Sequence, residues 1–247
     1  MSPSIPPTVL HDLAPTGNVR AAINFGNAVL AQRDATTGQP KGVSIDLARE
    51  LGRRLGVGVE LVPFDAAGKV FAALATGAWD VAFLAIDPQR AAEIAFTAPY
   101  VIIEGAYMVR GDSPLRANAD VDRPGVRIAV GRGSAYELYL TRTLKHAELV
   151  RMPTGSEAMA AFDRDRLDAV AGIRSPLVAH AAQHPGLRVL DGRFMAIEQA
   201  LGTPKDRAAG ANYLRLLVEA LKASGFVADA LARHGQRDAQ VAPPAAQ

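Results

Sequence analysis

The sequence predicts an α/β protein in which mostly parallel sheets are flanked by helices. Strand-like runs alternate with helix-like runs along the 247 residues, which is the pattern of βα units. The second half repeats the rhythm of the first half, so we expect two lobes of ordinary domain size. Hydrophobic residues make up 49% and charged residues 21%, a balance typical of soluble globular proteins.

Short apolar runs bounded by turn residues give the expected strands. These runs are Val19–Ile23, Val59–Val62, Val81–Leu84, Val126–Val130, Leu149–Met152, Ala169–Gly172 and Leu187–Leu190. Their spacing leaves room for one helix between most consecutive strands, as βα units require.

Amphipathic segments between these runs give the expected helices. In Ile45–Leu55, the residues Leu47, Leu51 and Leu55 form an apolar row at i, i+4 and i+8, and Gly56 suits a left-handed C-terminal cap. The remaining expected helices are Lys69–Thr76, a helix that opens at Ser134, Thr154–Asp165, Arg207–Lys222 and Phe226–Arg233.

Two longer apolar runs, Val101–Val109 and Phe194–Leu201, have the character of strands that cross from one lobe to the other. We therefore expect residues 18–109 with 202–235 in the first lobe and residues 110–201 in the second. Residues 1–17 and 236–247 are expected to be flexible, because the tail is rich in Ala, Pro and Gln.

Composition excludes several classes of function. The net charge of +2, without a stripe of Lys and Arg, argues against nucleic-acid binding. The absence of cysteine excludes thiolate metal sites and a cysteine nucleophile. The five histidines show no ligand spacing, so neither a metal nor another cofactor is expected. No apolar run is long enough to span a bilayer.

Arg90 is the first candidate for a ligand contact. It follows the apolar run Val81–Leu84 and therefore lies at the carboxyl end of an expected strand, where ligands bind in open α/β sheets. Its guanidinium group suits a carboxylate, with two parallel charge-assisted hydrogen bonds. The alternative is a surface arginine that pairs with Glu93.

The order of several motifs resembles solute-binding protein family 3, the amino-acid-type binding proteins of ABC transporters. The matching segments are Gly42–Ala48, Leu55–Val57 with Val59–Pro63, Leu74–Asp80, Arg90, Phe96–Tyr100, Gly125–Ser134 and Arg166–Val170. Each motif alone is weak, but their order from about Val19 to Gly235 is specific. The resemblance implies a type II periplasmic-binding-protein fold, with two lobes that are joined by a two-stranded hinge and close on a small solute.

The resemblance also assigns candidate site residues. It implies that Arg90 holds a ligand carboxylate and that the turn at Gly133 and Ser134 donates amides to the same group. A helix N-terminus favours an anion for independent physical reasons. Ser134 also suits an N-cap, with Glu137 completing a capping box, and the two roles are compatible.

The departures from the family pattern bear on the ligand. Where the amino-acid binders place an acid for the ligand's ammonium group, this chain has Ile173, followed by Arg174. An ammonium group buried there would lack its counter-charge, which costs several kcal/mol, on the order of 3 to 5. Phe25 and Asn27 lie near a displaced aromatic position, and Asp87 replaces a hydroxyl residue in a loop about two residues shorter than usual.

Other charged residues have two interpretations. Glu104 lies in an apolar run and needs a partner, so it is either an acid in the cleft or a member of a hinge salt bridge. Arg132 and Arg174 would select an anionic ligand if both faced the cleft. Asp46 and Asp168 match motif positions whose expected role is structural.

The expected function is the capture of a small carboxylate-bearing metabolite by a monomeric binding protein, with an ABC transporter permease as partner. An organic acid is favoured over an amino acid because of Ile173. One alternative is an enzyme similar to cyclohexadienyl dehydratase, with Glu104 or Asp87 as general acid. Another is a cytoplasmic ligand sensor, because Met1–Phe25 lacks the pattern of a secretory signal, whereas the resemblance implies the periplasm.

Overall fold

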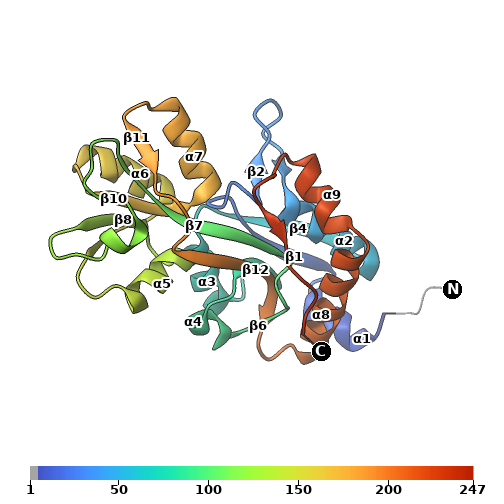
Figure 1. Ribbon diagram of the computed structural model, residues 1–247. Coiled ribbons are helices and arrows are strands. Elements are labelled where there is room, and N and C mark those ends of the chain that lie inside the picture. The colour runs from blue at the N-terminus through green and yellow to red at the C-terminus, as the bar shows by residue number, and fades with distance from the viewer. Residues whose placement is uncertain (1–4, 247) are drawn as a thin grey trace. The chain divides into compact units, whose positions relative to one another are not determined.

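The structure is a computed structural model that describes residues 5–246, and these residues form an α/β protein, as the sequence predicts (Figure 1). The chain divides into two compact units. Unit 1 consists of the residues up to 64, residues 69–102 and the residues from 198 on, and unit 2 consists of residues 65–68 and 103–197.

Unit 1 has a sheet in which three parallel strands are extended by antiparallel ones. The strands in spatial order are β4 (Gly58–Phe64), β1 (Asn18–Asn24), β5 (Val81–Ala85), β12 (Met195–Pro204) and β6 (Ile94–Phe96). All five residues of β5 are buried, which is typical of a strand in the centre of a sheet with both faces covered.

The helices of unit 1 pack on this sheet and on one another. They are α1 (Pro7–Leu13), α2 (Val43–Leu55), α3 (Ala67–Ala72), the short 3₁₀ helix Ala73–Thr76, α4 (Pro88–Ala91), α8 (Ala208–Ala223) and α9 (Phe226–Arg233). The apolar row of α2 is fully buried or nearly so, and Gly56 caps the helix with φ +70°, as predicted. Two short strands, β2 (Gln32–Arg33) and β3 (Pro40–Lys41), pair with each other.

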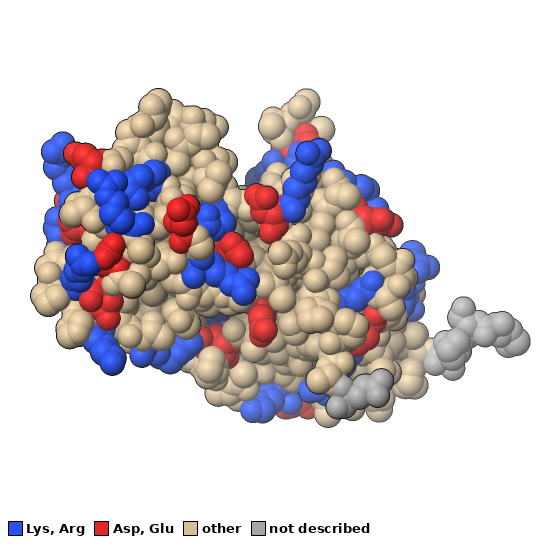
Figure 2. All heavy atoms as spheres, in the orientation of Figure 1, with Lys and Arg blue, Asp and Glu red and all other residues tan. Residues whose placement is uncertain are grey.

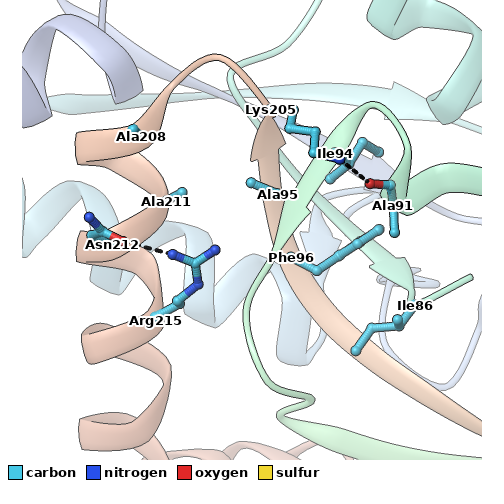
Figure 3. Close-up of a pocket in the computed structure, with 10 residues that line it drawn as sticks. All are labelled: Ile86, Ala91, Ile94, Ala95, Phe96, Lys205, Ala208, Ala211, Asn212 and Arg215. Carbon is cyan, nitrogen blue, oxygen red and sulfur yellow. Dashed lines mark hydrogen bonds between the residues drawn. The ribbon is translucent and has the colours of Figure 1, made fainter. Parts of the chain in front are cut away.

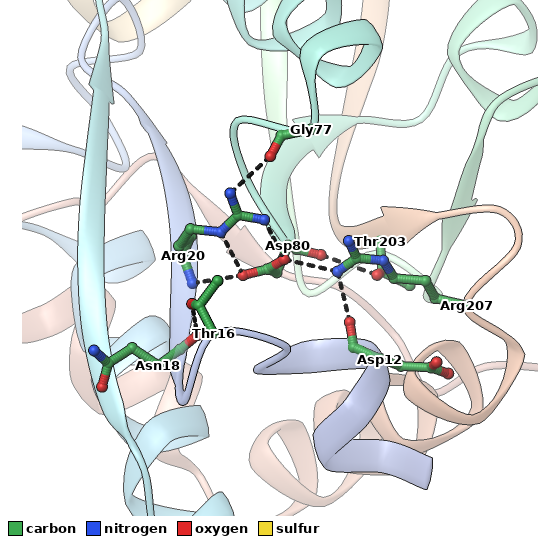
Figure 4. Close-up of polar contacts among 8 residues, drawn as sticks. All are labelled: Asp12, Thr16, Asn18, Arg20, Gly77, Asp80, Thr203 and Arg207. Carbon is green, nitrogen blue, oxygen red and sulfur yellow. Dashed lines mark hydrogen bonds and ion pairs between the residues drawn. The ribbon is translucent and has the colours of Figure 1, made fainter.

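A buried carboxylate ties the elements of unit 1 together (Figure 4). Asp80 lies immediately before β5 and has no exposed surface. Arg20 of β1 donates to it from its backbone N–H at 3.0 Å, from Nε at 3.0 Å and from Nη2 at 2.8 Å. Arg207, at the start of α8, donates from Nη1 at 2.7 Å, and the Thr203 hydroxyl of β12 donates to the Asp80 carbonyl at 2.9 Å.

Unit 2 repeats the plan of unit 1. Its parallel strands, in spatial order, are β9 (Glu148–Met152), β8 (Arg127–Gly131) and β10 (Ala169–Ile173), followed by the antiparallel strands β7 (Val101–Arg110) and β11 (Leu187–Val189). Its helices are the 3₁₀ helix Asn118–Asp120, α5 (Ala135–Thr143), α6 (Gly155–Arg164) and α7 (Arg174–Gln183).

Alternate residues of the unit 2 strands enter two separate cores, because successive side chains of a strand point to opposite faces. Tyr107 and Val109 lie in one core with Leu140 of α5. Met108 lies in the other core with Phe162 of α6. The sheet of unit 2 is therefore covered on both faces, which explains why its parallel strands are almost continuously apolar.

Parts of the two terminal segments expected to be flexible, residues 1–17 and 236–247, form regular structure. Residues 7–13 form α1, in which Leu13 is fully buried and the Asp12 side chain accepts a hydrogen bond from Gly210 N at 2.8 Å. Near the other end, β13 (Gln240–Val241) pairs with the first residues of β7. Residues 1–4 and 247 lie outside the described residues.

The two long strands β7 and β12 each contribute residues to both units. The division between the units falls after residue 102 in β7 and after residue 197 in β12, within the strands rather than at their ends. The first residues of β7 pair with β13 and its later residues pair with β10.

Replacing Asp80 with Asn will destabilise unit 1. Removing one partner of a buried ion pair costs about 3–5 kcal/mol, and Arg20 and Arg207 would lose their common counter-charge. We expect a loss of this order in the free energy of unfolding measured with urea. Asp165→Asn, which removes an exposed pair with Arg164, is the matched control and should change stability little. Equal effects of the two substitutions would contradict the role of Asp80.

The same carboxyl group predicts a pH dependence. Burial alone would raise the pKa of Asp80, but the hydrogen bonds from Arg20 and Arg207 outweigh it and hold that pKa below its usual value. The unfolded chain therefore binds a proton at Asp80 first, and the stabilisation is lost as pH falls from about 4 through the folded pKa. Asp80→Asn should consequently lose less stability on acidification than the unsubstituted protein.

Candidate functional site

The candidate residues of unit 1 come from neighbouring loops at one edge of its sheet. Strands β1 and β5 are parallel and paired, so their carboxyl ends meet at the same edge. Phe25 and Asn27 follow β1, and Asp87 and Arg90 follow β5. The fold thus brings these four predicted residues to one edge of the sheet.

Arg90 lies in the one-turn helix α4, and its side chain is only 1% exposed. The alternative of a surface arginine is therefore wrong. Its Nη1 donates to the Ala85 carbonyl, at the end of β5, at 2.9 Å. Burial lowers the pKa of Arg90 to about 10, and the charge of Asp87 acts in the opposite direction.

Asp87, Phe25 and Asn27 have local partners in the structure. Asp87 is the N-cap of α4, and its carboxylate accepts a hydrogen bond from Gln89 N at 2.9 Å. Asn27 is 7% exposed, and its side-chain oxygen accepts from Val29 N at 3.3 Å. The guanidinium carbon of Arg33 lies 4.5 Å from the centre of the Phe25 ring, at cation–π distance.

The candidate residues of unit 2 also converge on one sheet edge. Strands β8 and β10 are parallel and paired. The turn Arg132–Ser134 follows β8, and Ile173 and Arg174 mark the junction between β10 and α7. Arg132 is exposed, and its backbone N–H donates to Met152 O at 2.8 Å.

The N-terminus of α5 is occupied by a carboxylate of the chain itself. Ser134 is the predicted N-cap and accepts a hydrogen bond from Glu137 N at 3.1 Å. The Glu137 carboxylate accepts from Gly133 N at 3.1 Å and from Arg151 Nε at 2.7 Å. Burial alone would raise the pKa of Glu137, but Arg151 and the Gly133 amide hold it below its usual value. The Gly133 amide thus donates to a carboxylate of the chain itself.

Glu104 has the partners that its place in an apolar strand requires. Its carboxylate pairs with Arg174 Nε at 3.2 Å and with Arg193 Nη1 at 3.3 Å. Arg174 also donates from Nη2 to Leu190 O at 3.0 Å. Because two guanidinium groups share one carboxylate, this cluster of Glu104, Arg174 and Arg193 carries a net positive charge beside Ile173.

Asp46 and Asp168 hold secondary structure together. Asp46 of α2 pairs with Arg233 Nη2 and with His234 Nε2, each at 2.9 Å. Asp168 accepts a hydrogen bond from Arg127 N at 2.8 Å, at the start of β8. These contacts agree with the structural role expected for both residues.

Sequence reasoning missed Arg151 and Arg193, which complete the two charged clusters of unit 2. It also missed the stack of Phe194 on Tyr107, whose ring centres lie 4.4 Å apart. Arg193 is 89 positions from Glu104, and no local pattern links the two residues. The one available signal in the sequence was the charge of Glu104 within an apolar run, which indicates that Glu104 needs a partner but not which residue that partner is.

Within residues 5–246, no group of three or more His, Cys, Asp or Glu side chains could hold a metal ion. None of the helices in this range is both long and apolar enough to span a bilayer. Figure 2 shows basic and acidic side chains interspersed on the face in view, rather than a single basic patch.

A family model for bacterial extracellular solute-binding proteins, family 3, matches residues 28–237. This range includes every candidate site residue named above except Phe25 and Asn27. A comparison with curated proteins found no match.

Several solved structures have a similar fold. A mutant of ArgBP from T. maritima has a TM-score of 0.79 and 22% identity, over 93% of this chain and 100% of that chain. An amino acid ABC transporter substrate-binding protein from Streptococcus pneumoniae, bound to L-arginine, has a TM-score of 0.78 and 21% identity. The match covers 91% of this chain and 97% of that chain. An ancestral amino acid-binding protein, a precursor of cyclohexadienyl dehydratase, has a TM-score of 0.75 and 25% identity. The match covers 91% of this chain and 98% of that chain.

The turn at Gly133 gives a testable prediction. Gly133 has φ +69°, and an added Cβ would lie 2.7 Å from Gly68 Cα. Gly125→Ala is the matched control, since Gly125 has φ +84° but open space around it. Both variants should lose about 1–2 kcal/mol for a left-handed alanine, and Gly133→Ala should lose clearly more. Equal losses in urea unfolding would show that the approach to Gly68 is unimportant.

Proposed function

We propose that this protein captures a small carboxylate-bearing metabolite. The chain belongs to the bacterial extracellular solute-binding proteins, family 3. The observation that carries the proposal is the buried Arg90 at the carboxyl edge of the unit 1 sheet. Its guanidinium group offers a bidentate fork for a carboxylate. The Glu137 carboxylate on the Gly133 amide supports a second anion-binding position in unit 2.

An organic acid is the favoured ligand class. Ile173 offers no counter-charge to an ammonium group, and a cluster with net positive charge lies beside it. An α-amino acid would leave its ammonium group unpaired next to two arginines, whereas a second acidic group would be attracted to them. Arg174 and Arg193 of this cluster, together with Arg132 in the turn after β8, are the residues that would meet such a group.

Transport is the proposed context. The family supports periplasmic or extracellular capture by a monomer, closure of the two lobes on the solute and delivery to an ABC transporter permease. A cytoplasmic sensor is the alternative, and fractionation of native cells distinguishes the two.

Catalysis is not proposed. The family consists of binding proteins, although one similar structure is a precursor of cyclohexadienyl dehydratase. An elimination needs a proton donor over the leaving group. Glu104 is instead engaged by two arginines, and Asp87 caps α4.

Arg90→Lys will weaken the binding of the cognate acid. The substitution keeps the charge but loses the second parallel hydrogen bond of the guanidinium group, which costs about 1.5–3 kcal/mol, at least about tenfold in Kd. Titration calorimetry with a panel of small organic acids and amino acids measures the effect. Arg110→Lys, which removes an arginine bonded to Leu167 O and Phe162 O, is the control. If no compound shows binding that depends on Arg90, the proposal fails.

Ile173→Glu will change the ligand preference. The new carboxylate supplies the missing counter-charge, so the preference should move at least about tenfold from an organic acid toward the amino acid of the same carbon skeleton. Ile173→Gln has a similar size without the charge and should leave the ratio of the two Kd values nearly unchanged. If the ratio of the two Kd values were the same in both variants, Ile173 would not be part of the binding site.

A further inference from the structure

A pocket lies in unit 1, where α8 faces β6 and the segment around α4 (Figure 3). Its volume is about 470 Å³, within the range of about 300–1,000 Å³ for small-molecule sites. Its apolar lining includes Ile86, Ile94, Phe96 and Ala211. Ile94 is 1% exposed, so the pocket reaches down to the core of unit 1.

The polar groups of this pocket are cationic. Lys205 and Arg215 are both exposed, and the described residues that line the pocket include no acid. Arg215 donates from Nη1 to Asn212 at 2.7 Å, which leaves its other guanidinium N–H groups directed to solvent or to a ligand. An apolar floor with two cations above it suits a molecule that has an apolar body and one negative end.

Lys205 also fixes one wall of the pocket. Its Nζ donates to Ala91 O at 3.1 Å and to Ala92 O at 3.4 Å, the last residue and the C-cap of α4. Its backbone N–H donates to Glu93 O at 2.9 Å. A cation at a helix C-terminus is favoured, so this wall is formed before any ligand arrives.

We propose that this pocket binds a small amphipathic organic anion, with the apolar body on Ile94 and Phe96 and the acidic group between Lys205 and Arg215. The lining of the pocket includes Ile86 and Ala91 but not Arg90 itself, and the proposal does not depend on the proposed function. Burial of the apolar body supplies most of the affinity, and the two exposed cations select the negative end with a smaller contribution.

Octanoate below its micellar concentration is the probe, and titration calorimetry with the full chain is the measurement. Ala208→Phe, at the mouth of the pocket, should raise the Kd for octanoate at least tenfold, because the ring takes the space of the apolar body. Ala220→Phe lies on the same helix outside the pocket and should leave the Kd unchanged. Arg215→Gln should raise it about two- to fivefold, the value of one exposed ion pair.

Neutral 1-octanol lacks the negative charge, so its Kd should be about two- to fivefold higher than that of octanoate. Arg90→Lys should leave octanoate binding unchanged, so a failure here is distinct from a failure at the Arg90 site. The proposal is overturned if octanoate does not bind, if Ala208→Phe and Ala220→Phe act alike, if octanol binds equally well, or if Arg90→Lys abolishes binding.

Discussion

The buried carboxylate of Asp80 is the interaction on which the architecture of unit 1 depends. A charge with no exposed surface is tolerated only when it is fully paired, and Arg20 and Arg207 supply that pairing from β1 and α8. The carboxylate therefore fixes the start of β5 relative to its neighbours. Since β5 leads directly into α4, the same contacts help to position the backbone of α4, which carries Arg90.

Both units use the same principle to position polar side chains. Parallel strands end at a common edge, and the loops that follow them carry Arg90 in unit 1 and the turn at Gly133 in unit 2. The two proposed anion positions differ in their present partners. Gly133 donates to Glu137, a resident carboxylate, whereas Arg90 donates to the Ala85 carbonyl. A carboxylate ligand at Gly133 has to share that amide with Glu137 or use neighbouring donors.

Sequence patterns were reliable where local physics decides the outcome. The apolar row of α2 and the left-handed Gly56 depend on residues within one helix, and both predictions are confirmed. Helix α9 has the predicted bounds. Helix α7 was missed because Leu177 is its only buried residue and it has no apolar row, and α1 was missed although Pro7 at its first position is a helix-start signal.

The sequence by itself determined the α/β class, most of the strands but not β2, β3, β6 and β13, Arg90 as a candidate and the family pattern, because periodicity and motif order are properties of neighbouring residues. Only the tertiary structure decided the partners: Arg193 for Glu104, Arg207 for Asp80 and Arg151 for Glu137. It also buried Arg90 and opened the pocket beside α8. These features join residues far apart in the chain, and the pairing of a charge depends on distances that only the folded backbone sets.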